Sequence, residues 1–186
     1  YKYCAGYKIN LAFYEAAGLR GLEALIESVK AIPKNRIKIC DAKRGDIGNT
    51  AELYARAYLD NLDFDSITIS PYMGFDSVSP FLQRKDKFLY LLVRTSNPGA
   101  DDFQTLKSGN KKFYDIVAAK ALTWSKNQIG YVIGANHLKE IKKYTSSKAN
   151  ISLLIPGIGV QGNDLESLIK NIKNNLFLIN ASRSVI

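Results

Sequence analysis

Two carboxylates and an ammonium group lie close together in the sequence, at the end of an apolar run. Asp41 and Lys43 follow residues 37–40, which are typical of a buried strand, and Asp46 comes shortly after them. Alternation along a strand places Asp41 and Lys43 on the same face. Because buried charges are unfavourable unless they are paired, opposite charges at the C-terminal end of a strand suggest a reaction centre. Taken alone, however, the Asp-x-Lys spacing favours an ordinary ion pair at the strand rim.

A glycine-rich loop and an arginine near the end of the sequence indicate a second site, for an anion. The loop 156–162 follows a predicted strand and precedes a predicted helix. Its glycines allow backbone N–H groups to approach an anion, and the amide of Gln161 can close over it. Arg183 follows the last predicted strand and offers a planar fork suited to phosphate. A glycine-rich turn by itself is usually only a turn, but together with Arg183 it favours phosphate binding.

These side chains must be positioned by strands and helices that alternate along the chain. The strands predicted from apolar runs are 5–9, 36–41, 66–70, 88–94, 130–133, 152–155 and 176–179. The helices predicted from helical spacing are 19–29, a helix capped by Asn49 or Thr50, a short one at 139–143, and helices at 115–125 and 164–173. Such alternation indicates parallel βαβ units.

The number of strands leaves two folds open, a (β/α)₈ barrel and an open doubly wound sheet. Two observations favour the barrel. The candidate site residues follow many successive strands, as they do in barrel enzymes. In addition, no Gly-x-Gly-x-x-Gly motif opens the first helix. We therefore expect an α/β protein with a (β/α)₈ TIM barrel, a single catalytic domain over residues 1–186, in a fragment that lacks its first strand and last helix.

The composition excludes several classes of protein. A chain of 186 residues that is 46% hydrophobic can bury one good core. No apolar stretch is long enough to cross a membrane, and the N-terminus does not resemble a signal peptide. Cys4 and Cys40 have no metal-ligand spacing, which favours a reduced, cytoplasmic protein. The net charge of +9 is spread along the chain, without a nucleic-acid-binding signature, and suits a small anionic substrate.

Together, the motifs from Lys8 to Arg183 resemble those of the orotidine 5′-monophosphate decarboxylase family. The family's Asp-x-Lys-x-x-Asp signature matches Asp41, Lys43 and Asp46. The other matching positions are Lys8, Ile47, Thr50, Ser96, Pro156, Gly157, Gly159, Gln161 and Arg183. The resemblance implies an enzyme that uses neither metal nor organic cofactor and removes CO₂ from C6 of orotidine 5′-monophosphate, giving uridine 5′-monophosphate.

The resemblance also implies a role for each residue of the charged group. Lys43 would stabilise the carbanion at C6 and then protonate it, while Lys8 and Asp41 would hold Lys43 in place. Asp46, together with Thr50, would enter the neighbouring subunit's site of a homodimer.

The resemblance further implies how the substrate is bound. Ser96 would hydrogen-bond the pyrimidine ring. Residues 156–161 and Arg183 would bind the phosphate.

Some positions do not follow the family pattern or have two interpretations. No aspartate precedes Lys8, where the family's first strand has one that holds the ribose, and Ser182 stands where relatives often have glycine. Asn10 lies on the same face as Lys8 and is either a ribose ligand or a structural amide. His137 is expected to be exposed or to cap a helix.

Two other functions stay open. One is a related barrel enzyme that acts on sugar phosphates with Mg²⁺, in which Asp41 would bind the metal. The matching residues 96–99 and Lys8 count against it. The other is a nucleotide-binding module without catalysis, which would bind uridine 5′-monophosphate but release no CO₂.

Overall fold

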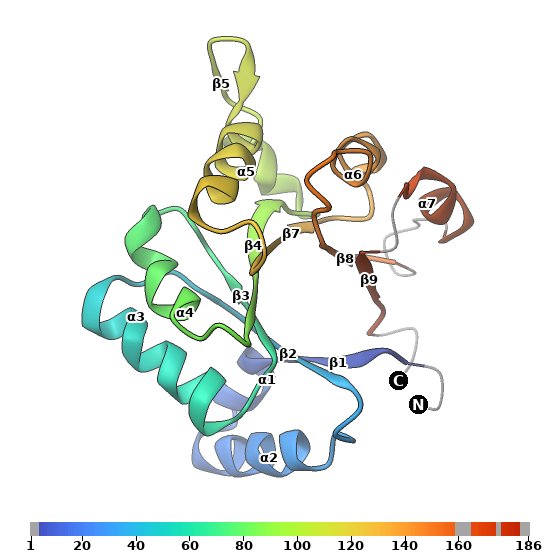
Figure 1. Cartoon of the computed structure of the whole chain (residues 1–186). Helices are drawn as coiled ribbons and strands as arrows, with labels where there is room; N and C mark the ends of the chain where they lie inside the picture. Colours follow the sequence, from blue (N-terminus) through green and yellow to red (C-terminus); the bar gives the residue numbers. More distant parts are fainter. Residues whose placement is uncertain (1–3, 159–164, 174–175, 183–186) are drawn as a thin grey trace. The chain divides into compact units, whose positions relative to one another are not determined.

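The computed structural model describes residues 4–158, 165–173 and 176–182 (Figure 1). The chain forms two compact units, Tyr1–Leu89 and Tyr90–Ile186. In both units, strands alternate with helices along the chain, as the apolar patterns predicted. None of the helices in the described residues is long and apolar enough to cross a membrane. A single domain over residues 1–186 stays a prediction.

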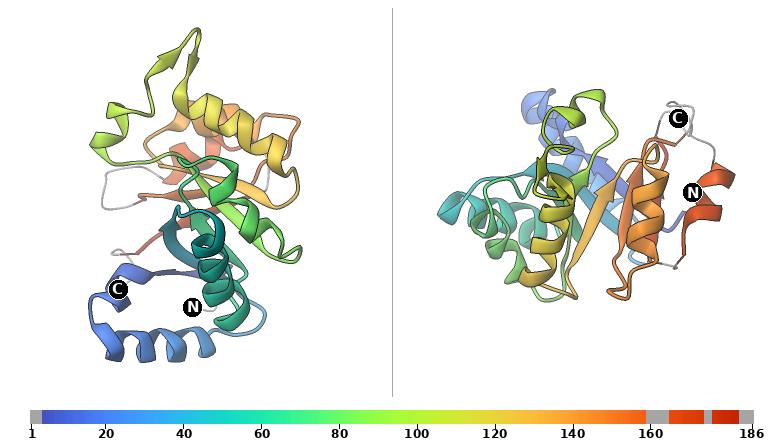
Figure 2. Two further views of the ribbon diagram at one scale, coloured as in Figure 1. Left: turned by 90° about the vertical axis from the view of Figure 1, so that its left-hand side faces the viewer. Right: turned by 90° about the horizontal axis from the view of Figure 1, so that it is seen from above.

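The first unit is built around three parallel strands. They are β1 (Gly6–Asn10), β2 (Ile37–Arg44) and β3 (Ser66–Ile69), adjacent in that order. Its helices are α1 (Leu11–Glu15), α2 (Gly18–Lys30), α3 (Gly48–Ala55) and α4 (Ser79–Leu82), with η1 (Arg56–Asn61) and η2 (Phe75–Ser77) between them. Helix α1 contacts α2, and α3 contacts α4 and η2 (Figure 2). Every residue of β3 is buried, as is typical of a strand inside a parallel sheet.

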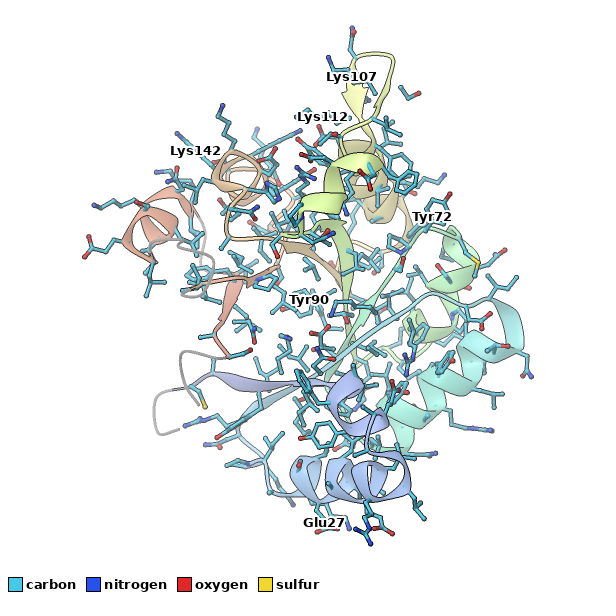
Figure 3. The ribbon with its side chains drawn as sticks, turned by 180° about the vertical axis from the view of Figure 1, so that it is seen from behind. Glu27, Tyr72, Tyr90, Lys107, Lys112 and Lys142 are labelled. Atoms are coloured by element: carbon cyan, nitrogen blue, oxygen red, sulfur yellow. The ribbon has the colours of Figure 1, made fainter. Side chains whose placement is uncertain are left out.

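The second unit is also built from strands that alternate with helices. Its main strands are β4 (Phe88–Arg94), β7 (Ile129–Ile133), β8 (Leu153–Pro156) and β9 (Phe177–Asn180), and β8 pairs in parallel with both β7 and β9. Its helices are η3 (Pro98–Asp102), α5 (Phe113–Trp124), α6 (Leu138–Thr145) and α7 (Leu165–Asn171). Strands β5 (Lys107–Ser108) and β6 (Lys111–Lys112) form a small antiparallel hairpin, with Lys107 and Lys112 labelled in Figure 3. Two-residue strands have no periodicity, so the sequence did not predict this hairpin.

The predicted elements are confirmed, with most ends shifted by a few residues. Strand 88–94 has the predicted bounds. The shift that matters most is in β2, which was predicted to end at Asp41 and continues to Arg44. Lys43 therefore lies within the strand, as Asp41 does, and not beyond its end. The start of the last predicted helix, Asp164, lies outside the described residues.

The predicted cap of α3 was wrong. The helix begins at Gly48, after the N-cap residue Ile47, whose side chain has no polar atom to offer the helix. Gly48 has a φ of +54°, a conformation that glycine adopts without strain, and it lets the chain enter the helix early. Asn49 and Thr50 consequently lie in the first turn, where both are exposed.

Candidate active site

Lys8, Asp41 and Lys43 form a charge cluster on the neighbouring strands β1 and β2. One carboxylate oxygen of Asp41, Oδ2, accepts a hydrogen bond from Lys8 Nζ. The other, Oδ1, accepts one from Lys43 Nζ at 2.5 Å. The side chains of Asp41 and Lys8 are 8% and 12% exposed, whereas that of Lys43 is 50% exposed. The carboxylate is thus buried between two ammonium groups, and Lys43 is the member of the cluster most accessible to a ligand.

The lysines keep the Asp41 carboxylate ionised. Burial alone would raise the pKa of Asp41, because it disfavours the charged form. The charge of Lys8 and the hydrogen bonds from Lys43 and Lys8 oppose burial and hold the pKa below its ordinary value of 3.8. At neutral pH, the cluster therefore has one negative charge that holds two ammonium groups close together.

The backbone at Lys43 departs from regular strand geometry. Lys43 has a φ of +49°, which is uncommon for a residue with a side chain, and the pairing of β2 with β3 shifts register between Cys40 and Arg44. Within this irregularity, the N–H of Lys43 donates to the hydroxyl oxygen of Thr68 on β3 at 3.0 Å. The Thr68 hydroxyl in turn donates to Asp41 Oδ1 at 3.1 Å. Such bulges redirect side chains next to active sites.

Asp46, Ile47 and Thr50 are not brought into this cluster. The Asp46 carboxylate accepts a hydrogen bond from the N–H of Ile47 at 2.8 Å, and it forms no ion pair with any described residue of the chain. Ile47 and Thr50 are exposed at the start of α3. A contribution of these three residues to a site with Lys43 stays a prediction.

Asn10 has a structural contact. It is the N-cap of α1, and its side-chain oxygen accepts a hydrogen bond from the N–H of Ala12 at 3.1 Å. This contact is of the structural kind that the sequence left open. A role of Asn10 in ribose binding stays a prediction.

In the second unit, Ser96 lies in the turn between β4 and η3, next to a residue held by several polar contacts. The N–H of Thr95 donates to Gln104 Oε1, and Gln104 Nε2 donates to the Thr95 hydroxyl, both at 2.9 Å. His137 Nε2 lies 2.9 Å from the carbonyl oxygen of Thr95 and donates to it, because a carbonyl only accepts. His137 is the N-cap residue of α6, but its side chain makes no capping hydrogen bond. His137 thus takes the expected N-cap position, but its half-buried ring holds the Ser96 turn and does not cap the helix.

Gly134, which directly follows β7, allows this turn to approach closely. A Cβ at this position would lie 2.6 Å from Ser96 Cβ and 2.8 Å from Ser96 Cα, closer than atoms pack. The N–H of Gly134 also donates to the carbonyl oxygen of Arg94 at 2.8 Å. Sequence reasoning missed Gly134 and Gln104. A glycine after an apolar strand was the only signal, and it does not reveal which residue packs against it.

The predicted phosphate loop is described only at its start. Pro156 ends β8, and its carbonyl oxygen accepts a hydrogen bond from the N–H of Ala135 at 2.9 Å. Gly157 has a φ of +99°, in the region that favours glycine. The remaining predicted residues, Gly159, Gln161 and Arg183, lie outside the described residues.

In the part of the chain that the structure describes, no three His, Cys, Asp or Glu side chains gather in a way that could hold a metal ion. Both oxygens of Asp41 instead accept hydrogen bonds from ammonium groups. The site is therefore defined by charge pairing between side chains, with Lys43 placed to act on a ligand.

The alternation of parallel strands and helices defines an α/β protein, and comparison with solved structures identifies its fold as a (β/α)₈ barrel. The chain is similar to UMP synthase from Leishmania donovani, with a TM-score of 0.93 and 38% identity over 98% of this chain and 42% of that one. It is also similar to OMP decarboxylase from the same organism, with a TM-score of 0.90 and 36% identity over 98% and 73% of the two chains. The predicted barrel is thus confirmed.

The sequence comparisons identify the family. The family model described as "Orotidine 5′-phosphate decarboxylase / HUMPS family" matches residues 1–186. Orotidine 5′-phosphate decarboxylase from Dehalococcoides mccartyi (strain CBDB1) is 50% identical over 99% of this chain and 71% of the relative. The enzyme of that name from Christiangramia forsetii is 47% identical over 100% of this chain and 71% of the relative. The chain belongs to the orotidine 5′-phosphate decarboxylase / HUMPS family.

Proposed function

We propose that this chain acts as a carboxy-lyase that converts orotidine 5′-monophosphate to uridine 5′-monophosphate, the last step of de novo pyrimidine synthesis. The names of its relatives support the reaction. The observation that carries the proposal is the charge cluster of Lys8, Asp41 and Lys43, in which a buried carboxylate holds a half-exposed ammonium group.

The chemistry requires a positive charge beside C6 of the pyrimidine ring. When the bond from C6 to the carboxylate breaks, CO₂ leaves and the electron pair stays on C6, where no cofactor delocalises it. A fixed ammonium group opposes this charge without having to reorganise. Lys43 is the group we assign, because Asp41 holds its Nζ while half of its side chain is exposed. Lys43 then donates a proton to C6 and completes uridine 5′-monophosphate.

Asp41 and Lys8 prepare Lys43 for this role. Asp41 holds the ammonium group of Lys43 in place through its Oδ1, and the charge of Lys8 helps to keep Asp41 ionised. The same arrangement speaks against the Mg²⁺-dependent alternative. A carboxylate whose two oxygens both accept from ammonium groups presents positive charge, not free oxygen ligands, to an incoming cation.

The remaining substrate contacts follow the family resemblance. We propose that Ser96 hydrogen-bonds the pyrimidine ring and that Asn10 and Ile47 lie beside the nucleoside. Phosphate would be bound by Pro156, Gly157, Gly159, Gln161 and Arg183. Binding energy from the remote phosphate can contribute to loop closure around the reacting ring.

Mixing the purified protein with orotidine 5′-monophosphate in the presence of EDTA tests the proposal. We expect the absorbance of the substrate to fall as CO₂ is released, at the same rate with and without the chelator. Binding of uridine 5′-monophosphate without any release of CO₂ would instead identify a nucleotide-binding module. Turnover of a sugar phosphate that stops on addition of EDTA would favour the Mg²⁺-dependent enzyme.

Replacing Gly134 with alanine is expected to weaken substrate binding. The new Cβ would collide with Ser96 and displace it from the pyrimidine ring, so kcat/KM should fall about tenfold or more, the effect of losing one good hydrogen bond. Steady-state kinetics measure this change. The matched control is Gly99→Ala in η3, just after the Ser96 turn, where a Cβ would have only ordinary contacts, the nearest at 3.6 Å. Equal kinetics for the two variants would contradict the assignment of Ser96.

We further propose that the protein acts as a homodimer in which Asp46 and Thr50 contribute to the neighbouring subunit's site. Large apolar side chains are exposed on and beside α3 in the first unit. They are, with the exposed fraction of each residue, Ile47 (47%), Leu53 (44%), Tyr72 (79%), Met73 (48%) and Phe75 (47%). Tyr72 is labelled in Figure 3. Helix α3 contacts η2, which begins at Phe75, so both segments belong to one region. Exposed apolar residues next to Asp46 and Thr50 are what an interface between two copies requires.

A mixture of Lys43→Ala and Asp46→Ala subunits is expected to regain activity that neither variant has alone. In a mixed dimer with shared sites, one site receives both substitutions and the other receives none. Random exchange of subunits should then restore about a quarter of the wild-type sites. Activity is measured after mixing, and exchange is confirmed with differently tagged subunits. Lack of recovery despite exchange would mean that Asp46 acts within its own subunit.

We propose that the protein is cytoplasmic and that it acts on a small nucleotide, not on nucleic acid or a membrane. Cys40 is fully buried in β2, and burial raises the pKa of its thiol, which makes it an inert apolar side chain. The spread of positive charge along the sequence supports attraction of an anionic small molecule.

A further inference from the structure

Thr68 contacts both catalytic residues of β2 through one oxygen atom. It lies in β3, is 2% exposed, and is flanked by the fully buried apolar residues Ile67 and Ile69. Its hydroxyl oxygen accepts the hydrogen bond from the N–H of Lys43 and donates its own proton to Asp41 Oδ1. A polar side chain in such a strand needs partners, and Thr68 finds both of them in the charge cluster.

The chemistry of the partners sets the direction of both hydrogen bonds. A backbone N–H only donates, so the Thr68 oxygen must accept from Lys43. An ionised carboxylate only accepts, so the single hydroxyl proton must point to Asp41. Neither bond can be reversed while Asp41 is charged. The hydroxyl therefore couples the main chain of Lys43 to the carboxylate that binds the ammonium group of the same residue.

The coupling occurs where the strand is irregular. Regular pairing between β2 and β3 is interrupted after Cys40 and resumes at Arg44, whose carbonyl oxygen accepts from the N–H of Ser70 at 2.6 Å. Between these points, Lys43 adopts its positive φ, and its N–H bonds to a side chain and not to a strand carbonyl. A non-glycine residue keeps such a conformation only where its surroundings stabilise it. Thr68 supplies the hydrogen-bond acceptor that this conformation requires.

We propose that Thr68 is a positioning residue for Lys43. Its hydroxyl holds the backbone of residue 43 in the conformation that directs the side chain towards Asp41, and it orients Asp41 so that Oδ1 faces the Lys43 ammonium group. The proposal rests on the proposed function, in which Lys43 stabilises the charge at C6 and protonates it. Thr68 itself touches neither the substrate nor the reacting atoms.

The chain offers a closely matched control in Ser66. It lies two residues before Thr68 in the same strand, is also 2% exposed, and its hydroxyl has no hydrogen-bond partner among the described residues. Removing the Ser66 hydroxyl deletes a buried polar group from β3 without touching the charge cluster. A comparison of the two positions therefore separates the loss of a buried hydroxyl from the loss of the contacts to Asp41 and Lys43.

Kinetics of Thr68→Val, Thr68→Ser and Ser66→Ala test the positioning role. We expect Thr68→Val to lower kcat about 10- to 100-fold, with KM and the Kd of uridine 5′-monophosphate changed less than about threefold, because ground-state contacts remain. Thr68→Ser keeps the hydroxyl and should stay within about threefold of wild type, as should Ser66→Ala. Thr68→Ala serves as a second variant without the hydroxyl if the valine is not accommodated. The proposal would be overturned if Thr68→Val and Thr68→Ala kept the wild-type kcat. It would also be overturned if Thr68→Ser lost as much kcat as they do.

A second measurement does not depend on turnover. Acylation of individual lysines, followed by mass spectrometry, reports how firmly each ammonium group is held. Lys43 should react about threefold faster or more in Thr68→Val than in wild type or Thr68→Ser, as expected when a hydrogen-bonded group is released, while Lys38 should be unchanged. An unchanged rate at Lys43 would refute the positioning role. A protein that shows the labelling difference but no release of CO₂ would overturn the proposed function and leave the positioning role standing.

Discussion

Replacing Lys43 with alanine is expected to lower kcat by at least about 10⁴-fold, because one ammonium group supplies both the charge that opposes the C6 carbanion and the proton that follows. A product-like nucleotide should still bind, since the side chain is half exposed and its removal leaves no cavity in the core. Release of CO₂ under single-turnover conditions measures the chemical step, and titration with uridine 5′-monophosphate measures binding.

The matched control for this variant is Lys38→Ala on the same strand. The ammonium group of Lys38 pairs with the exposed carboxylate of Asp63 at 2.8 Å, away from the charge cluster. Its loss should change kcat less than about twofold, because this ion pair lies outside the charge cluster and its carboxylate is exposed to solvent. Near-normal turnover by Lys43→Ala would remove this residue from the reaction. An equal loss in both variants would show that the effect is structural.

Replacing Asp41 with alanine should affect both activity and stability. The substitution leaves the ammonium groups of Lys8 and Lys43 without their counter-charge, and the side chain of Lys8 is only 12% exposed. Removing one partner of a buried ion pair is strongly destabilising, so we expect the free energy of unfolding to fall by about 3 kcal/mol. Because Lys43 loses its hydrogen-bond partner, kcat should fall at least about 10³-fold. Urea unfolding and single-turnover kinetics measure the two effects.

Asp63→Asn is the control for the effect on stability. Asp63 also accepts hydrogen bonds from two lysines, Lys38 at 2.8 Å and Lys87 at 2.9 Å, and they lower its pKa to about 2. Its side chain is 70% exposed, however, so solvent screens these contacts. The substitution should therefore lower the free energy of unfolding by less than about 1 kcal/mol. A similar loss of stability for the two aspartates would contradict the importance of burial at Asp41.

The pH dependence of Asp41→Asn follows from the same charges. Because the pKa of Asp41 is lower in the folded chain than its ordinary value of 3.8, the ionised carboxylate stabilises the fold above that pH. Its contribution is lost as the pH falls through the lowered pKa. The difference in unfolding free energy between wild type and Asp41→Asn should thus be full at pH 7 and shrink below pH 3.8.

The sequence alone predicted those features that depend on residues close together along the chain. The continuous apolar run 88–94 predicted β4 with the bounds that the structure shows, because a buried parallel strand needs apolar side chains on both faces. The spacing of Asp41 and Lys43 predicted that their side chains meet, and they do. Gly157 stands in the glycine-rich loop that the sequence singled out, and its φ of +99° lies in the region that favours glycine, while its role in phosphate binding stays a prediction.

Only the tertiary structure revealed which distant residues hold the site in place. Lys8 meets Asp41 because the register of β1 with β2 pairs Asn10 with Asp41. Thr68 reaches the cluster from a third strand, and the ring of His137 holds the turn before Ser96 from a helix far along the chain.

The backbone at Lys43 is the clearest case of a feature that the sequence could not predict. Alternation predicts an ordinary extended residue there, but the structure has a positive φ and a shifted register. Hydrophobic periodicity and the spacing of charged residues depend only on residues that are close together in the sequence. Register, bulges and close packing depend on the neighbouring strands in the sheet, which are distant in the sequence. The sequence therefore indicated the reacting groups, and only the folded chain showed which residues position them.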